Sequence, residues 1–164
     1  MKAIMFPGQG SQKVGMGDDL FDRFSDELNT ANSILGYDLK TLCLEDPNQQ
    51  LNHTAFTQPA LFCVNHFSFL AHLREEGEAA VYLGHSLGEY NALVAAGALS
   101  FEEGLKLVQE RGRLMGNVKD GGMSAIIGLN VDQVSSILSD EACSGIDMAN
   151  LNAPNQIVVS GVVD

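Results

Sequence analysis

The sequence has few cysteines and no long apolar run. Its three cysteines, Cys43, Cys63 and Cys143, are far apart and include no Cys-x-x-Cys pair. An odd, scattered set of this kind does not indicate a disulfide framework or a redox pair. No apolar segment is long enough to span a bilayer, and the N-terminal residues lack the layout of a signal peptide. We therefore expect a cytoplasmic protein with reduced thiols and no membrane contact.

Basic residues are also scarce. Nine Lys and Arg residues stand against 21 Asp and Glu residues, which gives a formal net charge of −12. Binding along nucleic acid needs a basic face, so this class of function is not expected. The net negative charge would also repel an acidic partner, which would have to dock on a local basic patch of this protein.

Motifs for metals and phosphates are missing. No metal-ligand spacing is found among the four histidines, which are His53, His66, His72 and His85. Gly8 and Gly10 begin like a dinucleotide fingerprint, but Lys13 occupies the third glycine position, and no Gly-Lys-Ser/Thr occurs. We expect no metal and no cofactor. The loop at residues 7–12 is then either a simple turn or a backbone that approaches a ligand closely.

Residues 84–88, Gly-His-Ser-Leu-Gly, are the most informative segment. They follow an apolar run at 79–83 and precede a helix-like stretch at 89–96, which is the nucleophile-elbow pattern. A sharp strand-to-helix turn leaves room only for small side chains at Gly84 and Gly88. It would expose the Ser86 hydroxyl beside free N–H groups at the helix start, which can hold an oxyanion. The alternative is a serine between two chance glycines in a loop.

The second informative feature is Arg111, in a helix expected after the capping box of Ser100 and Glu103. On a helical wheel Arg111 falls in the middle of the apolar face, where it must find an anion or lose much of its hydration. It is therefore either a snorkelling or structurally paired arginine or a guanidinium that binds a carboxylate ligand. The wheel gives a polar face of Glu103, Lys106, Glu110 and Arg113 and an apolar face of Gly104, Leu107, Val108, Leu114 and Met115.

The remaining pattern indicates an α/β protein with two parts. Strands are expected at 2–6 and 79–83, with helices at 20–35, at 60–74 (Pro59 in the first turn) and from Ser100 to about Asn117. After a flexible junction at 119–122, strands are expected at 123–129, 146–151 and 156–160, with a helix at 131–138. We predict a core domain over residues 1–120 and part of a small α+β subdomain over residues 121–164.

Five segments carry the next observation: Phe6–Gln12, Thr57–Ala60, Gly84–Tyr90, Arg111–Gly112 and Asn152–Gly161. Together they resemble the corresponding segments of malonyl-CoA:acyl carrier protein transacylases. The resemblance covers the whole chain in the same order and spacing, and is strongest to stand-alone enzymes that serve polyketide synthases, with the fatty-acid-synthesis enzyme close behind. It implies an α/β-hydrolase-like core with a parallel sheet and a ferredoxin-like subdomain, incomplete at the C-terminus.

The family resemblance implies a role for each matched residue. Ser86 would take malonyl from coenzyme A as an ester and pass it to the phosphopantetheine thiol of a carrier protein. The N–H groups of Gln9 and Leu87 would form the oxyanion hole, and Leu87 in place of glutamine resembles the malonyl-selective members. Arg111 would hold the malonyl carboxylate through two parallel hydrogen bonds. The other substrate-binding positions would be Gln58, His85 and Met115, with His85 beside the acyl pocket and not acting as the base.

One departure concerns the general base. In the family that base is a histidine far downstream of the small subdomain, and no histidine of this sequence stands at the matching place. Serine is a poor nucleophile without a base. We therefore interpret the chain as the N-terminal part of an acyltransferase. The alternatives are an acyl hydrolase of the same fold that edits carrier proteins, a non-catalytic binding module, and a general serine esterase.

Overall fold

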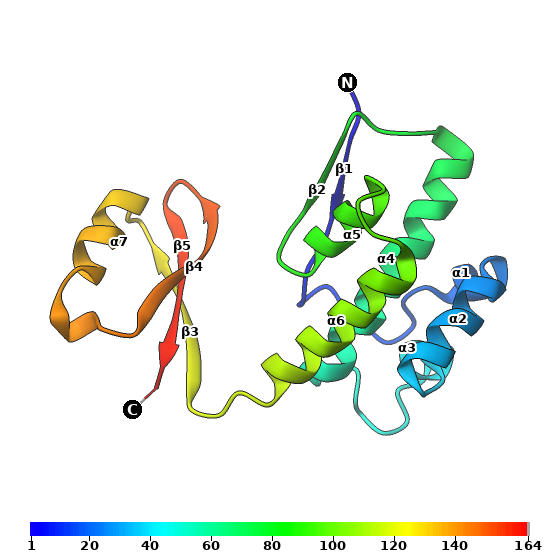
Figure 1. Ribbon diagram of the computed structural model, residues 1–164, viewed down its shortest axis with the longest axis horizontal. Coiled ribbons are helices and arrows are strands. Elements are labelled where there is room, and N and C mark those ends of the chain that lie inside the picture. Colours follow the sequence, from blue (N-terminus) through cyan, green and yellow to red (C-terminus); the bar gives the residue numbers. More distant parts are fainter. Residues whose placement is uncertain (164) are drawn as a thin grey trace. The chain divides into compact units, whose positions relative to one another are not determined.

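The computed structural model describes residues 1–163, which form two compact units, residues 1–117 and residues 118 onward (Figure 1). The first unit contains a parallel pair of strands, β1 (Ala3–Phe6) and β2 (Val81–Gly84). Phe6 is in register with Gly84, so the loop that follows β1 and the turn that follows β2 lie at the same edge of the sheet. The sequence expectation of an α/β class with a parallel sheet is confirmed.

Four helices separate the two strands, and two more follow them. They are α1 (Asp18–Arg23), α2 (Ser25–Leu35), α3 (Leu39–Leu44) and α4 (Thr54–Glu76), followed by α5 (Gly88–Ala95) and α6 (Phe101–Gly116). The long α4 packs against both α5 and α6 (Figure 1). The predicted capping box of α6 is present, because the Ser100 hydroxyl accepts from the Glu103 N–H and the Glu103 carboxylate accepts from the Ser100 N–H.

The prediction of a single helix over 20–35 is wrong. Phe24 has φ −125° and ψ 48°, which ends α1 and begins α2. Its side chain is 1% exposed and its ring stacks on Phe67 of α4, with 6.0 Å between centroids. The apolar spacing continues through the break because both short helices bury their apolar side in the same core. Helix α3, which the sequence analysis did not predict, is capped by the Asp38 side chain, which accepts from the Thr41 N–H.

Helix α4 begins at Thr54, earlier than predicted, so Pro59 lies inside it rather than in its first turn. Proline has no N–H, and the carbonyl of Ala55 therefore loses its usual intrahelical donor. The earlier start places Gln58 within the helix, with a fully buried side chain. The core of this unit is rich in aromatic residues, and its largest fully buried side chains include Phe21, Phe24, Phe62 and Phe67.

The second unit is a three-stranded antiparallel sheet with one helix. Its elements are β3 (Gly121–Ile127), α7 (Val131–Leu138), a 3₁₀ turn (Glu141–Cys143), β4 (Ile146–Ala153) and β5 (Gln156–Val162). Strand β5 lies between β3 and β4, and Ile157 and Val134 are buried. The strand–helix–strand–strand order agrees with the sequence expectation for this region.

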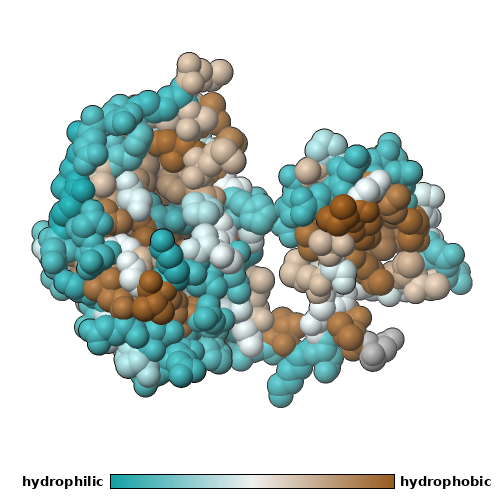
Figure 2. All heavy atoms as spheres, turned by 180° about the vertical axis from the view of Figure 1, so that it is seen from behind, coloured by the Kyte–Doolittle hydropathy of each residue, from teal (hydrophilic) through white to brown (hydrophobic). Residues whose placement is uncertain are grey.

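Both units expose large apolar side chains. Those of the second unit include Met123, Ile127, Leu151 and Val162. Figure 2 shows apolar side chains gathered on its surface. Over residues 1–163, no helix is both long enough and apolar enough to cross a membrane.

Candidate active site

Ser86 lies in a strained turn between β2 and α5. Its φ is 53°, in the left-handed region that a residue with a side chain rarely adopts. Strain of this kind typically costs about 1–3 kcal/mol and persists only where the surrounding structure imposes it. Backbone hydrogen bonds continue directly from the turn into the helix, from the Gly88 N–H to the His85 carbonyl and from the Glu89 N–H to the Ser86 carbonyl.

The two glycines of the motif are required by space. A Cβ on Gly84 would lie 2.1 Å from the Glu89 nitrogen and the Gly88 carbonyl carbon. A Cβ on Gly88 would lie 2.2 Å from the Phe6 carbonyl oxygen. Backbone atoms cannot move aside as a flexible side chain can, so the turn excludes larger residues at both positions. The strand, turn and helix expected for a nucleophile elbow are present.

The loop after β1 runs directly beside this turn. The His85 N–H donates to the Phe6 carbonyl at 3.0 Å, and a Cβ on Gly8 would lie 2.6 Å from the His85 carbonyl oxygen. Within residues 1–163 the N–H groups of Gln9 and Leu87 donate to no other protein group. The Gln9 side chain is held at the start of α4, where its Nε2 donates to Thr54 Oγ1 at 3.2 Å.

Arg111 reaches the serine. Its Nη2 donates to Ser86 Oγ at 3.0 Å, and its Nη1 donates to Gln58 Oε1 at 2.5 Å. The guanidinium also lies 5.9 Å from the centroid of the Tyr90 ring. In the described part of the chain it forms no ion pair with a carboxylate. The structure therefore brings Ser86, Gln58 and Arg111 together from three separate helix or turn segments and leaves the guanidinium without an anion.

Gln58 is fixed on both sides of its amide. Its Oε1 accepts from Arg111, while its Nε2 lies 3.3 Å from the sulfur of Met115. A fully buried amide with both ends engaged has little freedom to rotate, so it orients the guanidinium. Leu87 is also fully buried, whereas His85 is exposed.

The predicted apolar face of α6 is partly wrong. Its buried residues are Gly104, Leu105, Val108 and Gly112. Leu107, Leu114 and Met115 are 48%, 54% and 42% exposed, respectively, and Arg111 lies at the edge of the buried stripe rather than at its centre. The buried stripe follows the contact with α4, where Gly104 meets the Phe62 ring and Gly112 meets the backbone at Thr54. The helical wheel missed this because it weights large side chains and ignores close approach at glycine.

The histidines differ in their surroundings. His66 lies in α4 and stacks on Phe101, with 4.5 Å between ring centroids, and burial lowers its pKa to about 4. His53 directly precedes α4, makes no side-chain capping hydrogen bond and is exposed, and His72 lies further along the same helix. Ser86 Oγ has Arg111 as its single side-chain partner in residues 1–163. That part of the chain contains no cluster of three or more His, Cys, Asp or Glu side chains placed to hold a metal ion.

Two residues of this region were not singled out from the sequence. Thr54 holds the Gln9 side chain, and Tyr90 lies under the Arg111 guanidinium. Tyr90 stands four residues after Ser86, one helical turn into α5, so the elbow assignment could have indicated it. Thr54 gave no such signal, because its contact depends on α4 beginning six residues earlier than predicted.

The comparisons with known proteins identify the family of this chain. The family described as the acyl transferase domain matches residues 4–164, and the chain belongs to this family. It is 53% identical over its whole length to the polyketide biosynthesis malonyl CoA-acyl carrier protein transacylase PksC of Bacillus subtilis. It is 54% identical, again over its whole length, to the polyketide biosynthesis protein ThaF of Burkholderia thailandensis.

Solved structures that resemble this chain are also transacylases. The malonyl CoA-acyl carrier protein transacylase of Burkholderia pseudomallei superposes on 98% of this chain with a TM-score of 0.87 and 47% identity. The chain spans about half the length of such relatives: 57% of PksC and 56% of the Burkholderia pseudomallei chain, but only 14% of ThaF. A further structure, with a TM-score of 0.83 and 38% identity, is a malonyl-transacylase in complex with a type II polyketide synthase acyl-carrier protein.

Proposed function

We propose that this protein transfers malonyl from coenzyme A to the phosphopantetheine thiol of an acyl carrier protein through an ester on Ser86. The observation that carries the proposal is the Arg111 guanidinium, which contacts Ser86 Oγ at 3.0 Å and has no carboxylate partner in residues 1–163. A charged donor beside the nucleophile suits an acyl group that ends in a carboxylate. An uncharged acyl chain would leave it unpaired.

The chemistry follows from these groups. Ser86 Oγ attacks the thioester carbonyl, the carbonyl oxygen becomes an oxyanion, and the bond to sulfur then breaks to release the coenzyme A thiol. The N–H groups of Gln9 and Leu87 are the proposed donors to that oxyanion. In the second half the thiol of the carrier protein attacks the Ser86 ester and the serine hydroxyl is regenerated. No separate cofactor takes part, because coenzyme A enters as part of the malonyl thioester substrate and leaves as a product.

Ser86 also needs a proton acceptor. Its hydroxyl contacts Arg111, a donor that cannot serve as a base at neutral pH. Within the proposal, the base is the histidine that the family resemblance places beyond the small subdomain. The chain matches about half of each comparable transacylase, so this part of the proposal is tested in the natural full-length protein.

We further propose that the transferred group serves polyketide biosynthesis. The support is the higher identity to polyketide-pathway proteins, 53% to PksC, than to the malonyl CoA-acyl carrier protein transacylase of Staphylococcus aureus, 43%. Malonyl is the proposed acyl group in either case.

The test is the intact mass of the natural full-length protein after brief incubation with malonyl-CoA, beside a Ser86→Ala variant. We expect a single malonyl adduct that the variant lacks and that disappears when a phosphopantetheinylated carrier protein is added. Acetyl-CoA is the matched control substrate, because it lacks the carboxylate. An adduct that survives Ser86→Ala, or no adduct with the wild-type protein, would overturn the proposal. Release of free malonate without transfer to the carrier would instead identify an acyl hydrolase.

A further inference from the structure

A buried pair of asparagines connects the loop after β1 to the helix that follows Ser86. Asn65 of α4 is 9% exposed and Asn91 of α5 is 2% exposed. Asn65 Nδ2 donates to Asn91 Oδ1 at 3.1 Å and to the Pro7 carbonyl at 3.2 Å, and Asn91 Nδ2 donates to the Phe62 carbonyl at 2.9 Å. Neither residue contacts Ser86, Gln58 or Arg111 through a hydrogen bond.

The position of the Pro7 carbonyl gives this pair its significance. The carbonyl belongs to the peptide unit that precedes Gly8, and Gln9 follows immediately. Oxyanion donors work only if both are held at fixed positions before the reaction, since a displacement of about 1 Å can cost roughly 100-fold in rate. Leu87 is fixed by the turn and α5, whereas Gln9 is in a loop without regular structure. Some contact must hold that loop in register with α5.

The other side-chain hydrogen bonds that join the loop to the rest of the first unit are weaker candidates. Gln9 to Thr54 and Gln12 to Asn52 are exposed hydrogen bonds, at 3.2 and 3.1 Å, where water competes for both partners. The hydrogen bond between Asn65 and Asn91 is buried, and the hydrogen bond from Asn65 to the Pro7 carbonyl, which reaches the loop backbone itself, is partly buried. A hydrogen bond shielded from water is stronger, and leaving its polar groups unpaired is more costly, so the Asn65 contacts should affect the position of the loop more than the two exposed hydrogen bonds do.

We infer that Asn65 and Asn91 are positioning residues that hold the Gln9 loop against α5 so that the Gln9 and Leu87 N–H groups converge on one oxyanion. Asn91 acts through Asn65: its Oδ1 fixes the amide whose Nδ2 reaches Pro7. The inference rests on the proposed acyl transfer through Ser86. It predicts that the pair contributes to stabilising the transition state rather than to the binding of malonyl-CoA.

The experiment compares Asn65→Ala, Asn91→Ala and the double variant in the natural full-length protein, with steady-state transfer of malonyl to a carrier protein. We expect each single variant to lower kcat roughly 10- to 100-fold with KM for malonyl-CoA within about twofold. The double variant should lose little more than Asn65→Ala alone, because both residues act through one contact to Pro7. The control is Asn32→Ala, which removes a side-chain hydrogen bond to the Leu39 N–H in a different helix.

Unfolding midpoints separate positioning from stability. Asn32→Ala should lower the midpoint without a fall in kcat, while Asn65→Ala should lower kcat at a temperature where it is fully folded. Asn65→Ser, which replaces the amide donor with a hydroxyl donor, serves if the alanine variant does not fold and should recover part of kcat. Wild-type kcat retained in folded Asn65→Ala and Asn65→Ser, or a loss carried by KM, would overturn the inference. Failure of the wild-type protein to form the Ser86 adduct would instead overturn the proposed function.

Discussion

At the scale of single residues, the site depends on contacts that allow little substitution. At Gly84 and Gly88 a larger residue is excluded, because backbone atoms lie about 2 Å from where a Cβ would be. Between them, Ser86 has a left-handed backbone conformation. Arg111 is different, because its role is set by charge. It lies beside the serine without an anion among residues 1–163, which is the observation behind the proposed binding of a malonyl carboxylate.

Replacing Arg111 tests this point. Arg111→Ala should lower kcat/KM for malonyl-CoA by at least roughly 10- to 100-fold, because even one charge-assisted hydrogen bond to a carboxylate is worth about 1.5–3 kcal/mol. The effect on acetyl-CoA should be much smaller, so the preference for malonyl over acetyl falls. The measurement is loading of each acyl group onto the natural full-length protein, followed by intact mass over time.

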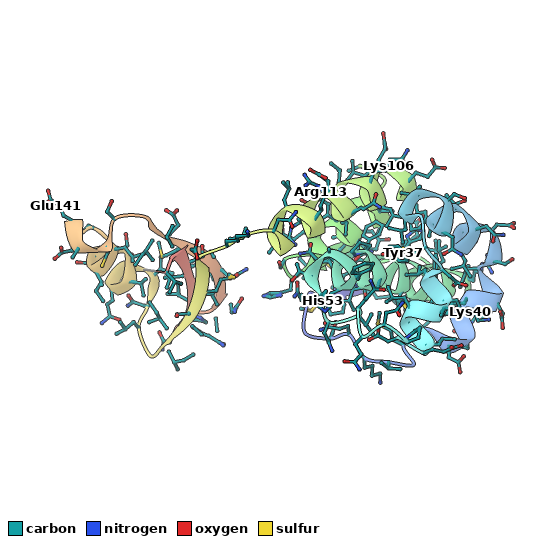
Figure 3. The ribbon with its side chains drawn as sticks, turned by 90° about the horizontal axis from the view of Figure 1, so that it is seen from below. Tyr37, Lys40, His53, Lys106, Arg113 and Glu141 are labelled. Atoms are coloured by element: carbon teal, nitrogen blue, oxygen red, sulfur yellow. The ribbon has the colours of Figure 1, made fainter. Side chains whose placement is uncertain are left out.

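The matched control is Arg113→Ala, two positions further along the same helix. Arg113 pairs with Glu110 at 2.6 Å, and both side chains are more than half exposed; Figure 3 labels Arg113 on α6, apart from Tyr37. Its loss should leave both loading rates within about twofold. Unchanged malonyl preference in Arg111→Ala would show that the carboxylate is held elsewhere.

At the scale of secondary-structure elements, the contact between α4 and α6 organises the first unit. Small residues let the helices approach closely: Gly104 faces Phe62, and Gly112 faces the backbone of α4 at Thr54. This approach brings Arg111 to Gln58. Near the start of α6, the buried His66 ring stacks on Phe101. A charged imidazolium would be poorly solvated there, and burial lowers the pKa of His66 to about 4.

This lowered pKa makes the stability of the contact depend on pH. Between pH 6.5 and 4 the unfolded chain binds a proton at His66 that the folded chain excludes. The contribution of the neutral His66 ring to the free energy of unfolding is therefore fully present above pH 6.5 and is lost as the pH falls. By linkage the loss reaches about 3 kcal/mol near pH 4. His66→Phe, which keeps a ring against Phe101, should therefore be less sensitive to acid than the wild type, as measured by urea unfolding at pH 7.5, 5.5 and 4.5.

Other groups also titrate over this range, so the comparison needs a second variant. His53→Gln alters an exposed histidine at the start of the same helix, and its pH profile should follow the wild type. If His66→Phe loses stability with acid as steeply as His53→Gln does, the buried ring is not the source of the effect.

At the scale of the whole molecule, the chain consists of two units joined by a short exposed segment. Residues 118–120 are exposed and lie between α6 and β3. Each unit has its own buried apolar residues, such as Phe62 in the first and Ile157 in the second. A connection of this kind is easier for a protease to reach than the helices on either side, because cleavage needs a locally extended backbone.

We therefore expect limited trypsin digestion of residues 1–164 to cut first after Lys119. The products should separate the first unit from the second, and mass spectrometry of the early fragments identifies the cut. Lys119→Gln should slow this first cut strongly, while Lys106→Gln, within α6, should leave its rate unchanged. A first cut within α6 would contradict the expected stability of that helix.

The sequence by itself determined the features that consecutive residues encode. The elbow was predictable because its strand, glycines and helix are adjacent in the chain, and most element boundaries followed from apolar spacing. The sequence left open whether Arg111 is a snorkelling or structurally paired arginine or one that binds a carboxylate ligand, since a helical wheel cannot show whether an anion is near. The break at Phe24 was hidden because the apolar spacing is the same on both sides of it.

Only the tertiary structure decided which distant residues meet. Gln58 and Arg111 are 53 residues apart in sequence, and their contact depends on the early start of α4 and on the glycine-lined approach of α6. The connection from Pro7 through Asn65 to Asn91 likewise joins three elements. No local pattern encodes such contacts, because their free energy comes from burying groups that become neighbours only after the helices have packed.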